Sequence, residues 1–272
     1  MKYTAGLDMG STYIKAVILS EDQVICGKAM APTGSKLSET SEEVLAAALK
    51  EAKLTREDIK YIITTGYGRH MVPFRDLQVT DLTASARGAQ MLFPETRTIL
   101  DIGGQTMKAT RVDGKGQVVT FRLNDKCAAG TGSFLSEIAE RAEINISEMS
   151  GLASLSAYDK ELNSFCTVFA KTEIMNWVFE GMKSPDIARG IYISIANKVA
   201  KMRLDPGIPT YMIGGVIAHH PYLKTLLNEK FDKDIQIIEN PQFTVSFGAA
   251  LIAMQTFNRD EINSKEKELQ IN

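Results

Sequence analysis

Cysteine is scarce in this chain of 272 residues, which contains only Cys26, Cys127 and Cys166. An odd number of thiols cannot all pair within one chain, and so small a set does not make a disulfide framework. We therefore expect free thiols that are available for other chemistry.

The chain also has little net charge and no long apolar run. Its 31 basic and 33 acidic side chains give a formal charge of −2, which provides no electrostatic footprint for nucleic acid or an anionic membrane. No uninterrupted apolar stretch approaches the roughly 20 residues that cross a bilayer, so we expect no membrane span. The first residues lack the apolar stretch and cleavage site of a secretory signal, and we expect a cytoplasmic protein.

Apolar residues make up 44% of the chain, enough for a real core, and their periods indicate strands and helices in a repeated order. A three-strand meander followed by helices and a further strand occurs twice, which predicts an α/β fold with two lobes and a ligand-binding cleft between them. We expect a first lobe over 1–94, joined by a closing helix at 246–257, a second lobe over 95–245, and a tail at 258–272 that is a solvated helix end or disordered. A capping box of Thr40 with Glu43 predicts the first helix.

Two turns share an aspartate at a strand end, followed by residues that can offer N–H and O–H donors to a phosphate. They comprise Asp8, Gly10, Ser11 and Thr12 in the first lobe, and Asp101, Gly103, Gly104 and Gln105 in the second. Either turn alone is more often an ordinary hairpin, but equivalent positions in two repeated units favour a triphosphate site. We expect Asp8 and Asp101 to hold Mg²⁺ mainly through water, and Gly214 and Gly215 to let a nucleoside approach closely.

These segments resemble the phosphate and adenosine motifs of the superfamily that groups actin, Hsp70 chaperones and sugar kinases, over residues 3–257. Within it, the strings at 65–69, 124–132, 166–170 and 247–251 resemble the activators of 2-hydroxyacyl-CoA dehydratases, of the BadF/BadG/BcrA/BcrD type, a family that includes ATPase subunits of benzoyl-CoA reductase and double-cubane cluster reductases. The resemblance implies an actin-like fold of two RNase H-like lobes with ATP or ADP in the interlobe cleft. The nucleotide-binding residues then also include Lys15, Gly130, Thr131 and Gly132.

Cys127 and Cys166 each precede an expected helix, whose N-terminal N–H groups favour a thiolate or an anionic cluster. A 4Fe-4S cluster needs four thiolates, and one chain offers two well-placed ones, so two chains would complete the set. This predicts a homodimer with one cluster on its two-fold axis, as the family resemblance also implies. On thiol count alone, two buried structural cysteines are the commoner alternative. Cys26 lies within an expected strand and is assigned to packing.

The resemblance implies that ferredoxin or flavodoxin supplies an electron, and that ATP changes the lobe and subunit angles as the dimer docks on an acceptor iron–sulfur enzyme of the dehydratase or double-cubane type. Gln105 is the candidate for positioning water or the γ-phosphate. Three positions depart from the family pattern: Thr106 and Lys171 replace usual acidic residues, and Ser85 lies where Cys-His-Ala is usual. We expect Thr106 to affect hydrolysis, and Lys171 to raise the cluster potential or to alter docking.

Two other functions fit the superfamily. A sugar-type kinase would need no cysteines and would need a carboxylate base near the sugar. An ATP-switched scaffold resembling actin or a chaperone would need a substrate-binding extension, which the sequence does not offer. His219 and His220 are not expected to form a metal pair, because adjacent residues on a helix do not share a face.

Overall fold

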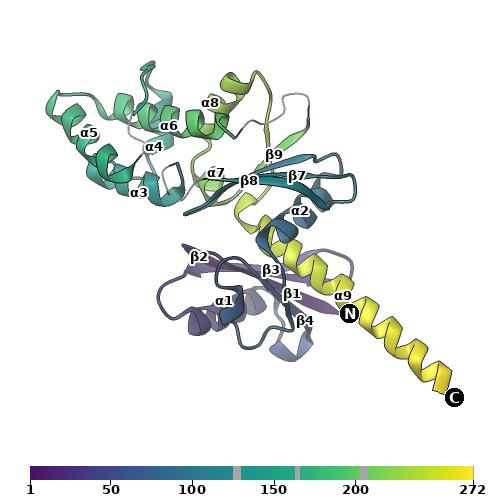
Figure 1. Ribbon diagram of the computed structural model, residues 1–272. Helices are drawn as coiled ribbons and strands as arrows, with labels where there is room; N and C mark the ends of the chain where they lie inside the picture. The colour runs from purple at the N-terminus through teal and green to yellow at the C-terminus, as the bar shows by residue number, and fades with distance from the viewer. Residues whose placement is uncertain (125–129, 163–165, 203–207, 272) are drawn as a thin grey trace. The chain divides into compact units, whose positions relative to one another are not determined.

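The computed structural model describes residues 1–124, 130–162, 166–202 and 208–271. By its internal contacts the chain divides into two compact units. Unit 1 consists of Met1–Pro94, Gly114–Val118 and Phe243–Asn272, and unit 2 consists of Glu95–Asp113 and Val119–Gln242. Each unit is built on its own five-stranded sheet (Figure 1).

The sheet of unit 1 has the order β3-β2-β1-β4-β5. Strands β1 and β2, and β2 and β3, pair antiparallel, whereas β4 lies parallel to β1 and β5 parallel to β4. Almost every residue of β1 is buried, as expected of a central strand covered on both faces. The strands are β1 (Tyr3–Met9), β2 (Tyr13–Ser20), β3 (Ile25–Pro32), β4 (Ile59–Thr65) and β5 (Leu77–Gln78).

Helix α1 (Leu37–Ala52) covers one face of this sheet through Val44, Leu45 and Ala48. The capping box expected at Thr40 is wrong, because α1 already begins at Leu37, and its N-cap Lys36 makes no side-chain cap hydrogen bond. Leu37 packs against the same apolar core, so its burial draws the first turn into the helix.

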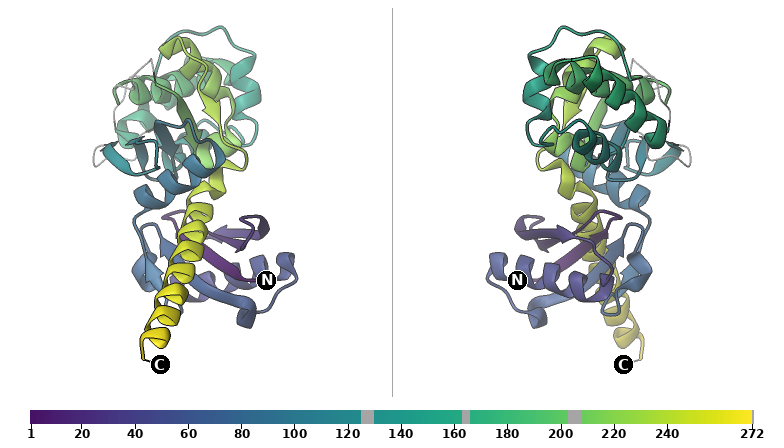
Figure 2. Two further views of the ribbon diagram at one scale, coloured as in Figure 1. Left: turned by 90° about the vertical axis from the view of Figure 1, so that its right-hand side faces the viewer. Right: turned by 90° about the vertical axis from the view of Figure 1, so that its left-hand side faces the viewer.

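Helices α2 (Asp81–Leu92) and α9 (Thr244–Ile271) pack against each other in unit 1, and α9 runs along β1, β2 and β4 (Figure 2). The approach is very close, since a Cβ added at Gly248 would lie 1.8 Å from the Ala84 carbonyl oxygen. The helix expected at 246–257 is therefore present but longer. Its charged extension is rich in good helix formers, which continue a helix already fixed by packing.

The sheet of unit 2 repeats the pattern of the first, with the order β10-β9-β6-β7-β8. Strands β6 and β7 pair antiparallel, and β6-β9 and β9-β10 pair parallel. The expected α/β fold with two mixed sheets is thereby confirmed. The strands are β6 (Thr98–Ile102), β7 (Met107–Val112), β8 (Val118–Leu123), β9 (Thr210–Ile213) and β10 (Gln236–Ile237).

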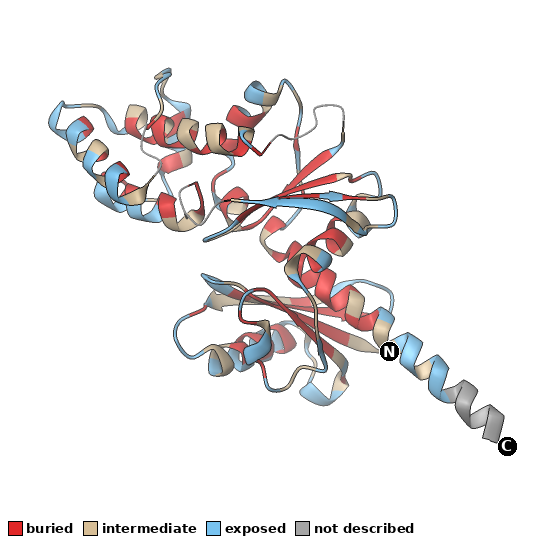
Figure 3. Cartoon of the chain, in the orientation of Figure 1, coloured by how far each residue is buried: buried red, intermediate tan, exposed pale blue. Residues whose placement is uncertain are grey.

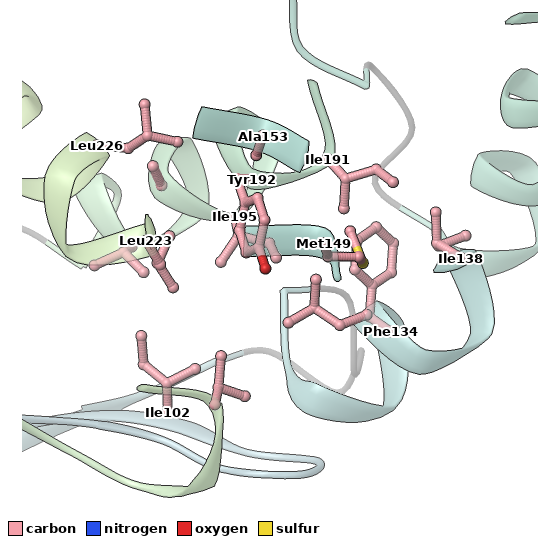
Figure 4. Close-up of a cluster of buried hydrophobic side chains, with 14 of the residues drawn as sticks. Ile102, Phe134, Ile138, Met149, Ala153, Ile191, Tyr192, Ile195, Leu223 and Leu226 are labelled. Carbon is pink, nitrogen blue, oxygen red and sulfur yellow. The ribbon is translucent and has the colours of Figure 1, made fainter. Parts of the chain in front are cut away.

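Six helices in the described part of unit 2 share a large apolar core, in which Phe134, Met149, Ile191 and Tyr192 are fully buried or nearly so (Figure 4). No described helix is long and apolar enough to cross a membrane. Helix α5 is the least covered, because Val168, Phe169 and Phe179 are exposed on it (Figure 3). The helices are α3 (Gly132–Arg141), α4 (Met149–Ser154), α5 (Thr167–Phe179), α6 (Ser184–Ala200), α7 (Gly215–His219) and α8 (Tyr222–Phe231).

Candidate functional site

Three side chains form a row across the sheet of unit 1, where β1 and β4 end. Asp8 on β1 is the register partner of Lys15 on the antiparallel strand β2 and of Thr65 on the parallel strand β4. Register partners on adjacent strands project from the same face of a sheet. Lys15 Nζ lies 2.9 Å from Asp8 Oδ2, and both side chains are largely buried. The row therefore places a paired carboxylate directly before the turn at 10–12.

The turn after Asp8 keeps its donors accessible. Ser11 and Thr12 are exposed, and Thr33 fixes the turn by donating from Oγ1 to the Gly10 carbonyl at 2.7 Å and from its backbone N–H to the Thr12 carbonyl at 3.0 Å. The hydroxyls of Ser11 and Thr12 are thus presented on a braced loop, which suits phosphate binding.

Gly66 closes the other side of Asp8. It directly follows β4 and has a φ of 85°, in the left-handed region that favours glycine. A Cβ there would lie 2.7 Å from Asp8 Oδ1 and 2.8 Å from the Met9 carbonyl oxygen. Glycine at this position is therefore what allows the chain to pass beside the carboxylate.

Unit 2 repeats this arrangement. Asp101 on β6 is the register partner of Lys108 on β7 and of Ile213 on β9, and Lys108 Nζ lies 3.4 Å from Asp101 Oδ2. Gly214 follows β9 with a φ of 103°, and a Cβ there would lie 2.6 Å from Asp101 Oδ1. The second carboxylate is thus held by the same elements as the first.

The glycine-rich residues expected at the second phosphate site lie together. The start of α3 docks on the turn after β6, because the N–H of Gly132 donates to the Gly103 carbonyl at 3.0 Å and the N–H of Ser133 to the Gly104 carbonyl at 2.7 Å. Thr131 is the fully buried N-cap residue of α3, and Gly130 directly precedes it. Gln105 is exposed at the tip of this turn. Gly215 begins α7, which follows Gly214.

Sequence reasoning missed Lys108, Gly66 and Thr65 as site residues. A signal for Lys108 was present, since it follows Asp101 by seven residues, just as Lys15 follows Asp8. That spacing acquires meaning only once the hairpin register is known. Gly66 and Thr65 were quoted as part of a motif without a role.

Of the two cysteines expected to bind a cluster, Cys127 lies outside the described residues. Cys166 is half-buried with a free thiol, and is the N-cap residue of α5, with φ −117° and ψ 134°. An extended N-cap leaves the first N–H groups of the helix close to its side chain. Cys26 packs against the core of unit 1, as expected.

Two of the departures from the family pattern have local explanations. Lys171 on α5 pairs with Glu137 on α3, at 2.6 Å between Nζ and Oε2, so its positive charge is balanced. Ser85 is buried in α2 and donates to the Leu82 carbonyl at 3.0 Å, within the stretch of small residues where α2 meets α9. Thr106 is exposed, and its carbonyl accepts from the Gly103 N–H at 2.8 Å.

His220 lies just after α7 and is buried, whereas His219 is exposed. His220 Nδ1 lies 2.7 Å from the hydroxyl of Tyr192, which is also 3.2 Å from Ser150 Oγ. Burial lowers the pKa of His220 to about 4 and raises the pKa of Tyr192 to about 12. Both groups are therefore neutral near pH 7.

Two similar α/β units, each with an aspartate at the end of its first strand, define the class of actin-like proteins. Solved structures share this fold at low identity: an ethanolamine utilization protein EutJ from Carboxydothermus hydrogenoformans has a TM-score of 0.60 at 16% identity, covering 92% of this chain and 90% of its own. A ROK family glucokinase from Streptomyces griseus has a TM-score of 0.53 at 14% identity, covering 93% and 99%. The expected actin-like fold is confirmed.

The chain belongs to the BadF/BadG/BcrA/BcrD ATPase family, whose model matches residues 5–253. It is 37% identical to the 2-hydroxyisocaproyl-CoA dehydratase activator of Clostridioides difficile, over 98% of both chains. The crystal structure of the Acidaminococcus fermentans (R)-2-hydroxyglutaryl-CoA dehydratase component A matches with a TM-score of 0.89 at 33% identity, covering 95% of this chain and 100% of its own. The resemblance inferred from the motifs is confirmed, and with it the assignment as an ATPase. The sugar-kinase alternative is not favoured, because its representative matches in fold alone.

Proposed function

We propose that this protein is an ATP-dependent activator that delivers a low-potential electron to an iron–sulfur enzyme of the 2-hydroxyacyl-CoA dehydratase or double-cubane type. The observation that carries the proposal is the free Cys166 thiol at the start of α5 in a chain whose relatives are named dehydratase activators. A subunit of the benzoyl-CoA reductase of Thauera aromatica, 31% identical, extends the relatives to a reductase.

The nucleotide part of the proposal is supported by the two carboxylate rows and their glycines. A related activator from Clostridium difficile, 36% identical with a TM-score of 0.88, was solved with bound ADPNP, covering 96% of this chain and 97% of its own. Gly66 and Gly214 leave space beside Asp8 and Asp101 that a Cβ would fill, so the residues present fit water-mediated Mg²⁺ and phosphate. Binding to phosphate is assigned to Lys15 and to the donors of the two turns, and the positioning of water to Gln105.

The redox part rests on thiol chemistry. Thiolate sulfur is the donor that iron–sulfur clusters require, and a helix N-terminus stabilises its negative charge. Cys166 fits that demand, and Cys127 is proposed as the second ligand from the same chain. When bound, a 4Fe-4S cluster supplies one-electron transfer. Because each chain brings two thiols, a homodimer would hold one cluster between its subunits, with ferredoxin or flavodoxin as the electron donor.

ATP can drive this transfer only by binding one conformation of the dimer better than another. We assign that differential binding to the turns after Asp8 and Asp101, and the response to the unit that carries Cys166. Exchange of ATP for ADP would then change how the dimer meets its acceptor enzyme.

Anaerobic purification with iron and sulfide analysis tests the redox part. We expect a brown dimer with about four iron and four sulfide per two chains, and loss of the colour in Cys127→Ser and in Cys166→Ser. The matched control is Cys26→Ser, which should keep the cluster because Cys26 packs in unit 1. A monomer that remains free of iron after reconstitution would rule out the redox account.

A further inference from the structure

Thr65 carries a polar group for which the protein offers no partner among the residues that the structure describes. It is the last residue of β4 and is fully buried. Its hydroxyl makes no hydrogen bond to any described residue. A buried hydroxyl without a partner costs about 1–3 kcal/mol relative to one that is satisfied. The neighbouring Thr64 does not share this feature, since its hydroxyl donates to the Arg69 carbonyl at 2.9 Å.

The position of Thr65 links this hydroxyl to Asp8. The two residues are register partners on adjacent parallel strands, so their side chains leave the same face of the sheet. Lys15 engages Oδ2 of Asp8, whereas Oδ1 faces β4, because a Cβ on Gly66 would lie 2.7 Å from Oδ1. The oxygen that Lys15 leaves free is therefore the one on the side of Thr65.

Phosphate competes for Lys15. The Asp8 side chain is only 11% exposed, and the ammonium of Lys15, at 2.9 Å, is its ion-pair partner. If Lys15 moves to an incoming phosphate, Asp8 loses the donor that orients it, and a buried carboxylate without a donor is strongly disfavoured. A donor already next to Asp8 would remove that cost.

We propose that Thr65 is a positioning residue for Asp8: its hydroxyl donates to the Asp8 carboxylate when phosphate binds Lys15, and so holds the carboxylate in place for hydrated Mg²⁺. This inference rests on the proposed nucleotide site at Asp8. The row in unit 2 has no such group, because its corresponding residue is the apolar Ile213. The hydroxyl is thus specific to the Asp8 row.

The test compares Thr65→Val, Thr65→Ser and Thr96→Val in the full-length, anaerobically purified protein. Valine keeps the branched shape and removes the hydroxyl, and serine retains it. Thr96 is the matched control, since it is fully buried in unit 2 with a hydroxyl that also has no partner among the described residues. The measurements are steady-state ATPase rates against ATP and against Mg²⁺, and urea unfolding without nucleotide.

A hydrogen bond to a charged group changes an equilibrium by roughly tenfold or more. We expect Thr65→Val to lower kcat/KM for ATP by about that factor and to raise the Mg²⁺ concentration needed for half-maximal rate. Thr65→Ser and Thr96→Val should stay within about twofold of the unsubstituted protein. Without nucleotide, Thr65→Val should be at least as stable, because an unsatisfied hydroxyl is removed.

An unchanged Mg²⁺ dependence in Thr65→Val would overturn the inference, as would a loss of stability without nucleotide that accounts for the lower rate. Asp8→Asn separates this failure from that of the proposed site. If Asp8→Asn abolishes ATPase activity while Thr65→Val is unaffected, only the role of Thr65 is wrong. If Asp8→Asn retains full activity, the nucleotide site at Asp8 is wrong, and the role of Thr65 with it.

Discussion

The carboxylate rows of the two units share a framework and differ in one side chain. Each has an aspartate, a lysine one hairpin position away and a left-handed glycine after the parallel strand. The row of unit 1 ends in Thr65, and that of unit 2 ends in Ile213. The shared framework is what strand pairing and close backbone approach require. The differing side chain is free to specialise, and it does so toward polarity only at Asp8.

The largest expected effect is on the glycines that both rows share. Gly66→Ala and Gly214→Ala should each lower the free energy of unfolding by about 3 kcal/mol or more, since left-handed strain alone costs about 1–3 kcal/mol. The added Cβ would meet backbone atoms at 2.8 Å and 2.5 Å, so Gly214→Ala should be the more severe. Urea unfolding is the measurement. Gly215→Ala is the control, because a Cβ there meets nothing within 4 Å; equal losses in all three variants would contradict the argument.

A smaller effect distinguishes the units by pH. The pKa of His220 is about 4 in the fold, against 6.5 for an ordinary histidine, so the unfolded chain takes up a proton that the folded one does not. Its contribution is fully present above about pH 6.5 and is lost toward pH 4, by at most about 1.4 kcal/mol per pH unit. Unfolding curves of His220→Gln should lack this slope, whereas His70→Gln, at an exposed site in unit 1, should keep it. A slope common to both variants would refute the assignment.

The smallest effect comes from making the rows alike. Ile213→Thr gives unit 2 the Asp8 pattern, and should cost about 1–3 kcal/mol, because it buries a hydroxyl that no nucleotide chemistry uses there. Ile213→Val, which only removes a methylene, should cost about 0.5–1.5 kcal/mol. Thermal unfolding with and without ATP and Mg²⁺ checks both. If Ile213→Thr gained stability from nucleotide beyond that of Ile213→Val, the two rows would be functionally equivalent.

Sequence reasoning predicted the parts of this protein that local pattern determines. The doubled meander, the aspartates at strand ends and the family were read from alternation and from turn chemistry. The helix α4 was missed, because six residues with Gly151 inside them give no helical period. The extension of α9 past Phe257 was left open, because its charged residues carry no apolar period and its helix is continued from turns packed elsewhere.

The rows themselves could not be predicted, for a different reason. Pairing Asp101 with Lys108, or Asp8 with Thr65, requires the register between strands, which depends on contacts distant in sequence. The partner of Lys171 likewise lies on another helix. What sequence supplies is a set of chemically able residues, and register decides which of them meet.

The pairing of Lys171 with Glu137 changes how that lysine is felt at Cys166. A lone ammonium is a monopole, whose potential falls off as the inverse of distance. An ammonium beside a carboxylate is a small dipole, whose potential falls off as the inverse square and depends on orientation. A charge reversal in one column of a family pattern therefore acts on its surroundings with much shorter reach than its sign suggests.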